Sequence, residues 1–275
     1  MPKTLTSILF ILSVQLNMAQ EPRSCEDIFE AVYSRWDEIT SMQYHSHKVE
    51  RHFDETVSGD LDFTIQRDPF KVAARMTDKG HWILFDPSMS QTDALYISNG
   101  FPYTNLMLDV NGKVFRGPNH YTISDAGCEF VFEIIRREYE RIPDEFTCYL
   151  DRRGSIPELV VHAETENFHW RKYTGKEGET VLDVAAKHSV SAYMILERNA
   201  SLSQYQDDCE GIELEIPSHY GSVVDIRFDA EHLMPTSIEN QDERGVYERY
   251  EYTNYRFNVE LDADFFTEDH LDDLD

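Results

Sequence analysis

Three histidines that could take part in chemistry lie close together in the first half of the chain, at His45, His47 and His52. Imidazole nitrogens bind zinc and exchange protons near neutral pH. The surrounding residues are typical of a strand, in which His45 and His47 would share one face. A metal site needs three or four converging ligands. We therefore predict ordinary surface histidines on a strand, with no metal and no cofactor.

Signatures of the common catalytic centres are missing from the sequence. It contains no Gly-x-Ser-x-Gly, no His-Glu-x-x-His and no glycine-rich phosphate loop. Its 52 acidic residues are too many for any carboxylate pair to be singled out as acid and base. Nothing in the sequence argues for an enzyme, and we predict a protein that is not one.

The most specific pattern lies between Tyr173 and Pro217, where two short helices stand between two short strands. Gly178 permits a tight turn before the first helix, and the Thr180 hydroxyl can cap that helix. Leu214 lies between two glutamates, so the closing strand would bury one face. The predicted order is a strand from residue 173, a turn at 178, helices over 180–188 and 191–198 with a break at 189–190, and a strand over 212–216.

The opening Tyr-Thr-x-x-x-Gly-Glu-Thr of this segment, its Ser-Val break, Asn199 and the closing Gly-x-x-Leu-x-Ile-Pro together resemble a LysM module. Modules of that family bind the N-acetylglucosamine-containing glycans of peptidoglycan or chitin through two loops. Glu179 stands where the family usually has Asp, and Ile212 where it usually has Gln. A module retained only for packing is the alternative. The glycan-binding residues that the resemblance implies are Gly178, Glu179, Thr180, Val181, Asn199, Ala200, Ser201 and Leu202.

The remainder of the chain has the pattern of two helices and many antiparallel strands. Ser24 followed by Asp27 predicts the capped start of a helix that runs through about Trp36. Ser124 predicts the cap of a second helix. Its inward face would hold Phe130, Val131, Ile134 and Ile135. The predicted strands cover residues 44–53, 61–66, 70–76, 82–85, 94–97, 146–150, 159–163, 223–228, 236–240 and 247–257, with a hairpin turn at Asn111-Gly112.

The order of these elements resembles the lipoprotein-carrier (LolA-like) fold and a bacterial family of unknown function with that architecture. Residues 117–127, 226–235 and 250–265 carry the resemblance. It implies an α+β fold, a curved antiparallel half-barrel sheet with packed helices, into which the LysM-like βααβ module is inserted. The predicted division is a signal peptide over 1–19, the half-barrel over 20–171, the LysM-like module over 172–218, the C-terminal strands of the half-barrel over 219–267 and an acidic tail over 268–275.

Aromatic side chains recur through the first half of the predicted sheet. On the concave face of a half-barrel they would either fill the hollow or line a cavity for an acyl chain. Aromatic residues at alternate strand positions are usually core, so both interpretations stay open. The residues concerned are Phe63, Phe70, Trp82, Phe85, Tyr96, Phe101 and Tyr103.

The N-terminus has the pattern of a secretory signal. Lys3 precedes an apolar run over residues 5–16, and Ala19 offers a small residue for cleavage. The run is too short to span a bilayer, so the protein is predicted not to be integral to a membrane. The formal charge of −27 repels nucleic acid and anionic membranes, and we exclude nucleic acid as a partner. We expect an exported protein of the periplasm or cell envelope, or a secreted one.

Four cysteines would meet an oxidising compartment after export, at positions 25, 128, 148 and 209. Sequence alone does not choose among the three possible pairings of four cysteines. Cys128 and Cys148 bracket the second predicted helix, so a bond between them is plausible. Buried free thiols are the alternative.

Together these observations predict a non-enzymatic cell-envelope protein. The LysM-like insert would bind peptidoglycan or a related N-acetylglucosamine glycan, and the half-barrel would hold a lipid or another apolar ligand. Two alternatives remain open. One is a wall-processing enzyme that the insert targets, and the other is an interaction scaffold whose half-barrel is fully packed.

Overall fold

The computed structural model describes residues 20–100, 104–127 and 129–274, so the predicted signal peptide over 1–19 lies outside the described residues. Its large sheet comprises β1 (Gln20–Pro22), β2 (Ser41–His52), β3 (Glu55–Arg67), β4 (Phe70–Met76), β5 (Trp82–Phe85), β6 (Asp93–Ile97), β7 (Leu106–Asp109), β8 (Phe146–Asp151), β9 (Glu158–Glu164), β12 (Val223–Asp229), β13 (Pro235–Asp242) and β14 (Gly245–Phe257). The other elements are α1 (Cys25–Asp37), α2 (Glu129–Arg141), β10 (Trp170–Thr174), α3 (Val181–His188), α4 (Ala192–Arg198), β11 (Glu213–Pro217) and α5 (Glu268–Asp272).

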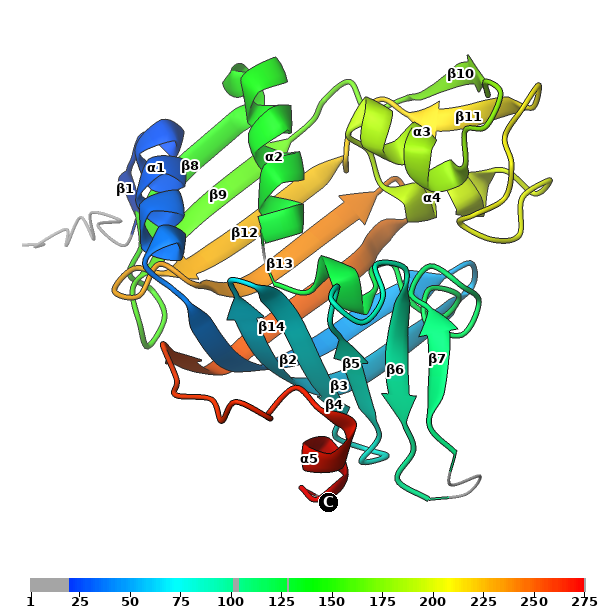
Figure 1. The fold of residues 1–275 in the computed structure, drawn as a ribbon. Coiled ribbons are helices and arrows are strands. Elements are labelled where there is room, and N and C mark those ends of the chain that lie inside the picture. Colours follow the sequence, from blue (N-terminus) through cyan, green and yellow to red (C-terminus); the bar gives the residue numbers. More distant parts are fainter. Residues whose placement is uncertain (1–19, 101–103, 128, 275) are drawn as a thin grey trace, which may run out of the picture.

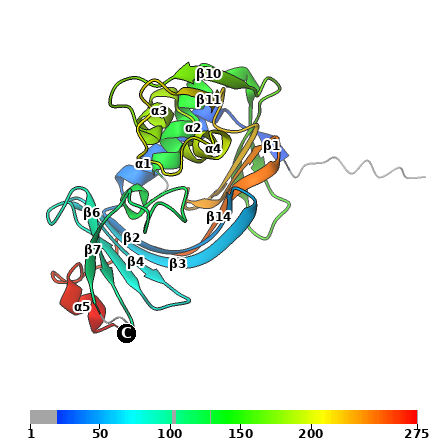
Figure 2. The ribbon, with the colours of Figure 1, turned by 90° about the vertical axis from the view of Figure 1, so that its right-hand side faces the viewer.

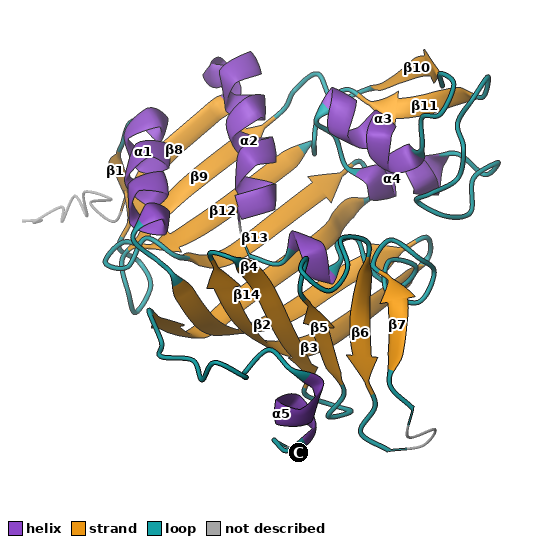
Figure 3. Ribbon diagram, in the orientation of Figure 1, coloured by secondary structure: helices purple, strands orange, loops and turns teal. Residues whose placement is uncertain are grey.

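The twelve strands form one open antiparallel sheet in the order β1-β8-β9-β12-β13-β14-β2-β3-β4-β5-β6-β7 (Figures 1 and 3). The sheet curves, and α1, α2 and the segment from β10 to β11 lie on its concave side (Figure 2). The last strand of the chain, β14, pairs with the second strand, β2. The predicted mostly antiparallel, incomplete barrel with few helices is confirmed. None of the described helices is both long and apolar enough to cross a bilayer.

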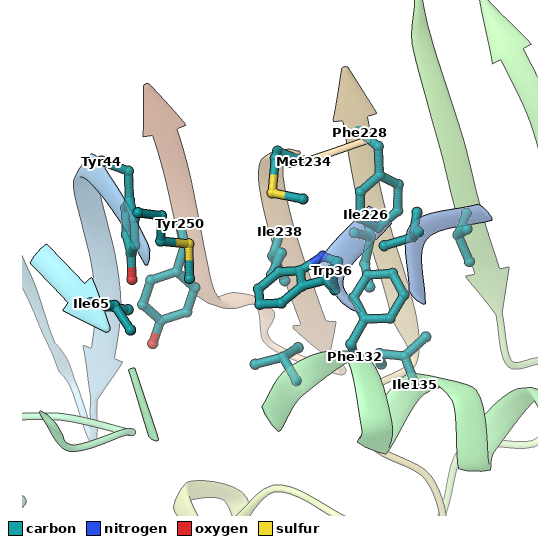
Figure 4. Close-up of a cluster of buried hydrophobic side chains, with 14 of the residues drawn as sticks. Trp36, Tyr44, Ile65, Phe132, Ile135, Ile226, Phe228, Met234, Ile238 and Tyr250 are labelled. Atoms are coloured by element: carbon teal, nitrogen blue, oxygen red, sulfur yellow. The ribbon is translucent and has the colours of Figure 1, made fainter. Parts of the chain in front are cut away.

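The main core lies between the concave face and the two helices α1 and α2. Ser24 caps α1 by accepting a hydrogen bond from the Asp27 amide, as predicted. The apolar stripe of α1 ends in Trp36, which packs with Phe132 of α2 over the sheet (Figure 4). Phe132 in turn meets Phe228 of β12 edge to face, with ring centroids 5.0 Å apart. Aromatic residues therefore fill this half of the hollow, as core.

The disulfide differs from the Cys128–Cys148 bond that the sequence made plausible. Cys148 on β8 bonds to Cys25 at the start of α1, and their Cα atoms lie 5.2 Å apart. The Arg23 amide donates to the Cys148 carbonyl, so the pairing of β1 with β8 brings the start of α1 to this strand. Cys128 lies outside the described residues, and Cys209 is a buried free thiol.

The second predicted helix begins later than the sequence indicated. Ser124 does not cap it, because residues Ile123–Asp125 form a 3-10 turn that the Thr122 amide closes by donating to the Asp125 carboxylate. The helix α2 starts only at Glu129. Of the four residues predicted to face inward, Val131 and Ile135 are buried and Ile134 half-buried, whereas Phe130 is 42% exposed.

The predicted hairpin at Asn111-Gly112 is also wrong. The Asn111 amide donates to the Asp109 carboxylate, and the Arg116 amide donates to the Gly112 carbonyl. These turns follow the end of β7, and the next strand along the chain is β8. The local sequence therefore makes a turn, but the chain then leaves the edge of the sheet and crosses its concave side.

The acidic C-terminal tail, which the sequence marked only by its charge, folds back onto the convex face of the sheet. There Leu271 of α5 and Phe266 pack against Trp82 and Leu84 of β5. Trp82 thus belongs to the face opposite the hollow. Of the other aromatic residues singled out in the sequence, Phe63, Phe70, Phe85 and Tyr96 join the concave-side core, and Phe101 and Tyr103 lie outside the described residues.

The segment from β10 to β11, called the insert below, has the predicted βααβ order. Its outer strands pair, with Trp170 opposite Pro217, so its two ends are adjacent as expected for an insertion. Thr180 caps α3, and Ser191 caps α4. Tyr247 of β14 joins the apolar core of the insert, so the insert packs firmly on the sheet domain.

Candidate functional site

A hollow lies between the concave face of the sheet and the segment 115–127 that follows β7. We call it hollow A, and it encloses about 130 Å³. Every second residue of a strand points to the same face, and β2 is long enough to send four side chains into the hollow. These are Tyr44, Ser46, Lys48 and Glu50, and they are joined by Leu61, Phe63, Ile83, Tyr250 and Tyr252 from neighbouring strands.

One end of hollow A is aromatic. The Tyr44 ring stacks on Phe63 with centroids 5.0 Å apart, and Tyr252 meets Tyr44 at 5.9 Å. Tyr44 is buried, whereas Phe63 and Tyr252 are half-buried and keep part of their surface available. Leu61 and Ile83 are half-buried beside them. This end offers an apolar surface that the core does not use up.

The other end of hollow A is charged. The Lys48 ammonium lies 2.7 Å from a Glu50 carboxylate oxygen and also donates to the Asn119 side chain. These side chains are largely shielded from water, at 12% exposed for Lys48 and 2% for Glu50. A buried ion pair of this kind presents fixed donors and acceptors to whatever enters the hollow.

Glu50 is ionised although it is buried. Burial works against the charged form. The charge on His120, with hydrogen bonds from His52 and Lys48, outweighs burial and holds the pKa of this carboxyl well below its usual range. Tyr250 also donates its hydroxyl to the carboxylate. Burial, followed by the Glu50 charge, raises the pKa of Tyr250 well above its ordinary value, so this phenol remains a donor.

A second buried carboxylate, Glu248, lies directly opposite Glu50 in the register of β14 and β2. Like charges at opposed positions destabilise a sheet. Here Tyr121 and Tyr220 each donate to Glu248 at 2.9 Å, and the Asn240 amide donates at 2.6 Å. Burial, followed by the charge of Glu248, raises the pKa of both tyrosines well above the ordinary value.

His120 connects the two carboxylates. Its Nδ1 lies 2.7 Å from Glu248, its amide donates to Glu50 at 3.3 Å, and its Nε2 lies 2.9 Å from the Arg51 carbonyl. Because a carboxylate and a carbonyl only accept, the geometry suits a ring that carries a proton on both nitrogens. Tyr193 of the insert stacks on this ring at 3.9 Å. The insert therefore completes the cluster.

This Glu–His–Tyr cluster is not arranged as an acid–base centre. A general base must lie within hydrogen-bonding reach of the proton that it removes. Both ring nitrogens of His120 are occupied, and Glu248 is fully enclosed by its donors. Of the two carboxylates of the cluster only Glu50, already paired with Lys48, borders hollow A, where Tyr121 and Tyr250 also line the wall. The arrangement can hold a ligand by hydrogen bonds, but it offers no free proton acceptor.

Two further hollows lie where the insert packs on the sheet domain. Hollow B, of about 310 Å³, lies between α2, the segment 116–125 and the junction of α3 and α4. Hollow C, of about 280 Å³, lies between the segment 111–118, the end of β2 and residues 193–205. Tyr121 lines both A and B, and Arg116 lines both B and C.

The eight residues predicted to bind glycan fall in two turns of the insert, and none of them lines hollow A, B or C. Two of them, besides Thr180 with its bond to Asp183, form hydrogen bonds within the insert. Glu179 accepts from Tyr173 and Lys187, which holds its pKa at about 2, with Lys187 as the largest cause. Asn199 donates to the carbonyls of Ile195 and Glu215. Of the rest, Gly178, Ala200 and Ser201 are exposed, Thr180 is half-buried, and Val181 and Leu202 are buried.

The three histidines separate in the structure. His45 and His47 share one face of β2, as predicted, and both bond to Asp60 of β3. His52 lies elsewhere, 4.9 Å from the His120 ring. Throughout the described part of the chain, no three His, Cys, Asp or Glu side chains gather as a metal site would require.

Sequence reasoning did not single out Glu50, His120 or Glu248. One signal was available on β2, where Ser46, Lys48 and Glu50 have the same parity as the inward-facing Tyr44. Polar residues at inward positions of a strand indicate a buried polar site. The partners that make it a site come from distant segments and carry no local pattern.

No family model matches the sequence, and no curated protein matches it. Solved structures to which the chain is similar include lipoprotein LppX of Mycobacterium tuberculosis, with a TM-score of 0.39, 9% identity and coverage of 87% of this chain and 100% of that one. A LolA superfamily protein of Nitrosomonas europaea has a TM-score of 0.32 and 12% identity, and the match covers 88% of this chain and 98% of that one. A DUF1329 family protein of Desulfovibrio piger has a TM-score of 0.36 and 7% identity, and the match covers 89% of this chain and 96% of that one. A LolA superfamily protein is thus among the structural neighbours, at low identity and low TM-score.

Proposed function

We propose that this is a binding protein whose hollow A takes one end of a small amphipathic ligand. The observation that carries the proposal is the pairing, in one hollow, of a half-exposed aromatic surface with a fixed ion pair. An apolar group would pack against Phe63 and Tyr252, while a polar atom of the same ligand would bond to Lys48 or Asn119. Ligand sites usually combine mostly apolar walls with a few placed polar groups.

The size of hollow A limits what can enter. Its volume of about 130 Å³ is close to that of an apolar cavity of ~150 Å³ that takes up benzene. The hollow therefore suits a single ring or the last carbons of an acyl chain, and a whole lipid tail would extend beyond it. Such an extension would pass Tyr121, which lies between hollows A and B.

The test is saturable binding of the fluorescent fatty acid cis-parinarate to the purified protein. Leu61→Trp fills hollow A and is expected to abolish binding. Leu106→Trp is the matched control, because Leu106 is an exposed leucine on β7 that does not line the hollow, and it should bind normally. Absence of binding by the unmodified protein, or equal binding by the two variants, would refute the proposal.

A second proposed activity is glycan binding by the insert, which we keep as a LysM-like module over residues 172–218. Its βααβ order and the exposed residues Gly178, Ala200 and Ser201 support it. The test is co-sedimentation with purified peptidoglycan. Ser201→Trp should prevent it, and Ser155→Trp, in an exposed loop of the sheet domain, should not. Sedimentation that neither variant alters would place any wall binding outside this loop.

We also propose that the protein is exported by its N-terminal segment and acts in the cell envelope. The mature protein should begin at Gln20, and N-terminal sequencing of exported material would show it. A wall-processing enzyme remains the alternative, and release of soluble muropeptides by the purified protein would establish it. Hollow A weighs against the fully packed scaffold, because a ligand-sized space remains under the segment 115–127.

A further inference from the structure

Two buried polar side chains that line hollow C have donor atoms without partners. Arg116 is 5% exposed and Tyr205 is 2% exposed. Across the described residues, neither the Arg116 Nε nor the Tyr205 hydroxyl has a hydrogen-bond partner. The Arg116 guanidinium lies over the Tyr205 ring, with its Cζ 5.0 Å from the ring centroid. Buried donors are nearly always paired in folded proteins, so two unpaired donors at one hollow indicate a ligand.

The charge around hollow C is opposite to that of the protein. Among the described residues that line it, none is acidic, although the chain has 52 acidic residues. Arg116 bonds through Nη1 to Asp125 at 2.9 Å, and these two charges cancel. Lys113 lines the hollow, is exposed, and forms no ion pair with any described residue. One positive charge is therefore left uncompensated, which favours a ligand with one negative charge.

The free part of the Arg116 guanidinium suits a carboxylate. Its Nη1 is engaged with Asp125 and Asn111, whereas Nε and Nη2 make no hydrogen bond within the described part of the chain. Two neighbouring N–H groups of a guanidinium form the planar fork that binds both oxygens of a carboxylate. Lys113 could add a third contact as a point charge.

The rest of hollow C is mixed in character, and it belongs to both parts of the molecule. Phe53 and Leu196 supply apolar surface, and Ser203 and Gln204 supply polar groups. Arg116 comes from the sheet domain, whereas residues 193–205 belong to the insert. A volume of about 280 Å³ accommodates a single substituted ring. A ligand here would touch the sheet domain and the insert together.

We propose that hollow C is a second binding site, for a small monocarboxylate with a compact hydroxylated body. The carboxylate of the ligand binds Arg116 and Lys113. The body of the ligand lies against Tyr205 and the neighbouring insert residues Ser203 and Gln204. This site is separate from hollow A and takes a ligand of a different class.

The experiment is isothermal titration of the protein with glucuronate, glucose and glucose 6-phosphate, which share a ring and differ in charge. Glucuronate should bind saturably, and glucose at least about tenfold more weakly, because it lacks the charged acceptor. Absence of glucuronate binding overturns the proposal. Tighter binding of glucose 6-phosphate than of glucuronate also overturns it, because the site would then favour a phosphate.

Variants locate the binding. Lys113→Gln should weaken glucuronate several-fold, and Lys176→Gln should not, although both remove an exposed ammonium without an ion pair in the described chain. Arg116→Lys keeps the positive charge beside Asp125 but loses the guanidinium fork. It should lower the affinity for glucuronate about tenfold or more. Equal affinities of the two lysine variants would overturn the proposal. That comparison holds even if Arg116→Lys does not fold, because both lysines are on the surface.

Discussion

The buried cluster around Glu50 and Glu248 and the loops of the insert satisfy their polar groups in different ways. Tyr250 bonds to Glu50 across 200 residues of sequence, and His120 bonds to Glu248 across 128. In the insert, the bond between Thr180 and Asp183 spans 3 residues. The cluster is buried, and its hydrogen bonds join several elements. The loops are half-exposed, and their polar groups find partners within the insert.

The difference matters for what each region contributes. Partners in the cluster come from β2, β14, the segment before α2 and the insert, so losing one of them leaves a buried charge without a partner. Loss of a contact in the loops leaves a group that water can reach. The cluster should therefore carry stability, and the exposed loops should carry little of it.

The sharpest way to test this contrast is Glu248→Gln. The change leaves the charge on His120 without its carboxylate, and breaking a buried ion pair costs about 3–5 kcal/mol. Urea denaturation followed by circular dichroism measures the free energy of unfolding. Glu251→Gln, an exposed glutamate on the same strand, is the control and should stay within about 0.5 kcal/mol. Equal losses in the two variants would contradict the contrast.

The disulfide provides the second test, since it is another link between distant segments. Cys25 and Cys148 are 123 residues apart. Removing a cross-link that closes so long a loop should cost about 2–4 kcal/mol, so Cys25→Ser should lower the urea midpoint. An unchanged midpoint would mean that the bond does not form in solution.

The third test is the pH dependence of Glu50→Gln. The folded-state pKa of Glu50 lies below its ordinary value of 4.5, so its contribution is fully present above that pH and is lost as the pH falls below it. At neutral pH the variant should be about 2 kcal/mol less stable than the unmodified protein. Urea midpoints measured over a pH series should converge in acid. A difference in urea midpoint that stays constant over the pH series would show that Glu50 is not ionised in the folded protein.

A smaller effect is expected in the insert. Thr180→Ala removes the hydroxyl that caps α3 and bonds to Asp183 at 2.6 Å. Loss of a cap costs about 1 kcal/mol. Hydrogen exchange should show faster exchange of the α3 amides, while the amides of β2 and β14 keep their protection. A loss as large as that of Glu248→Gln would remove the distinction between the two regions.

The smallest effect should come from Ser201→Ala. Ser201 is exposed and makes no hydrogen bond within the described chain, so stability should change by less than about 0.5 kcal/mol. Thermal unfolding of the two proteins is the measurement. A clear shift in the midpoint would mean that this loop carries a structural contact.

Features set by neighbours in the chain were predictable. Ser24 caps α1 and Thr180 caps α3 because a hydroxyl needs only the amide three residues later. The alternation of apolar and polar residues, with turn signals between the runs, predicted β2 to β6, β8, β9 and β12 to β14. Helix caps and a turn predicted the βααβ order of the insert. These patterns depend on interactions over a few residues, which a single sequence displays.

Features that depend on distant partners were not predictable. Ser124 is a reasonable cap by itself. However, the Thr122 hydroxyl donates to the Val110 carbonyl, and Arg116 donates to the Asp125 carboxylate, so partners outside the expected cap hold this segment and α2 begins only at Glu129. Cys128 was a plausible partner of Cys148 because the two bracket a predicted helix, whereas strand pairing brings Cys25 to Cys148.

The sequence by itself therefore determined β2 to β6, β8, β9 and β12 to β14, the caps of α1 and α3 and the βααβ order of the insert, while the resemblance of its element order indicated the half-barrel class. Only the tertiary structure decided that Glu50, His120 and Glu248 meet, that Cys25 bonds to Cys148, and that the insert closes hollows B and C. The physical reason is that burying a charge requires partners from several directions, and a curved sheet brings some of them from segments as far as 200 residues apart.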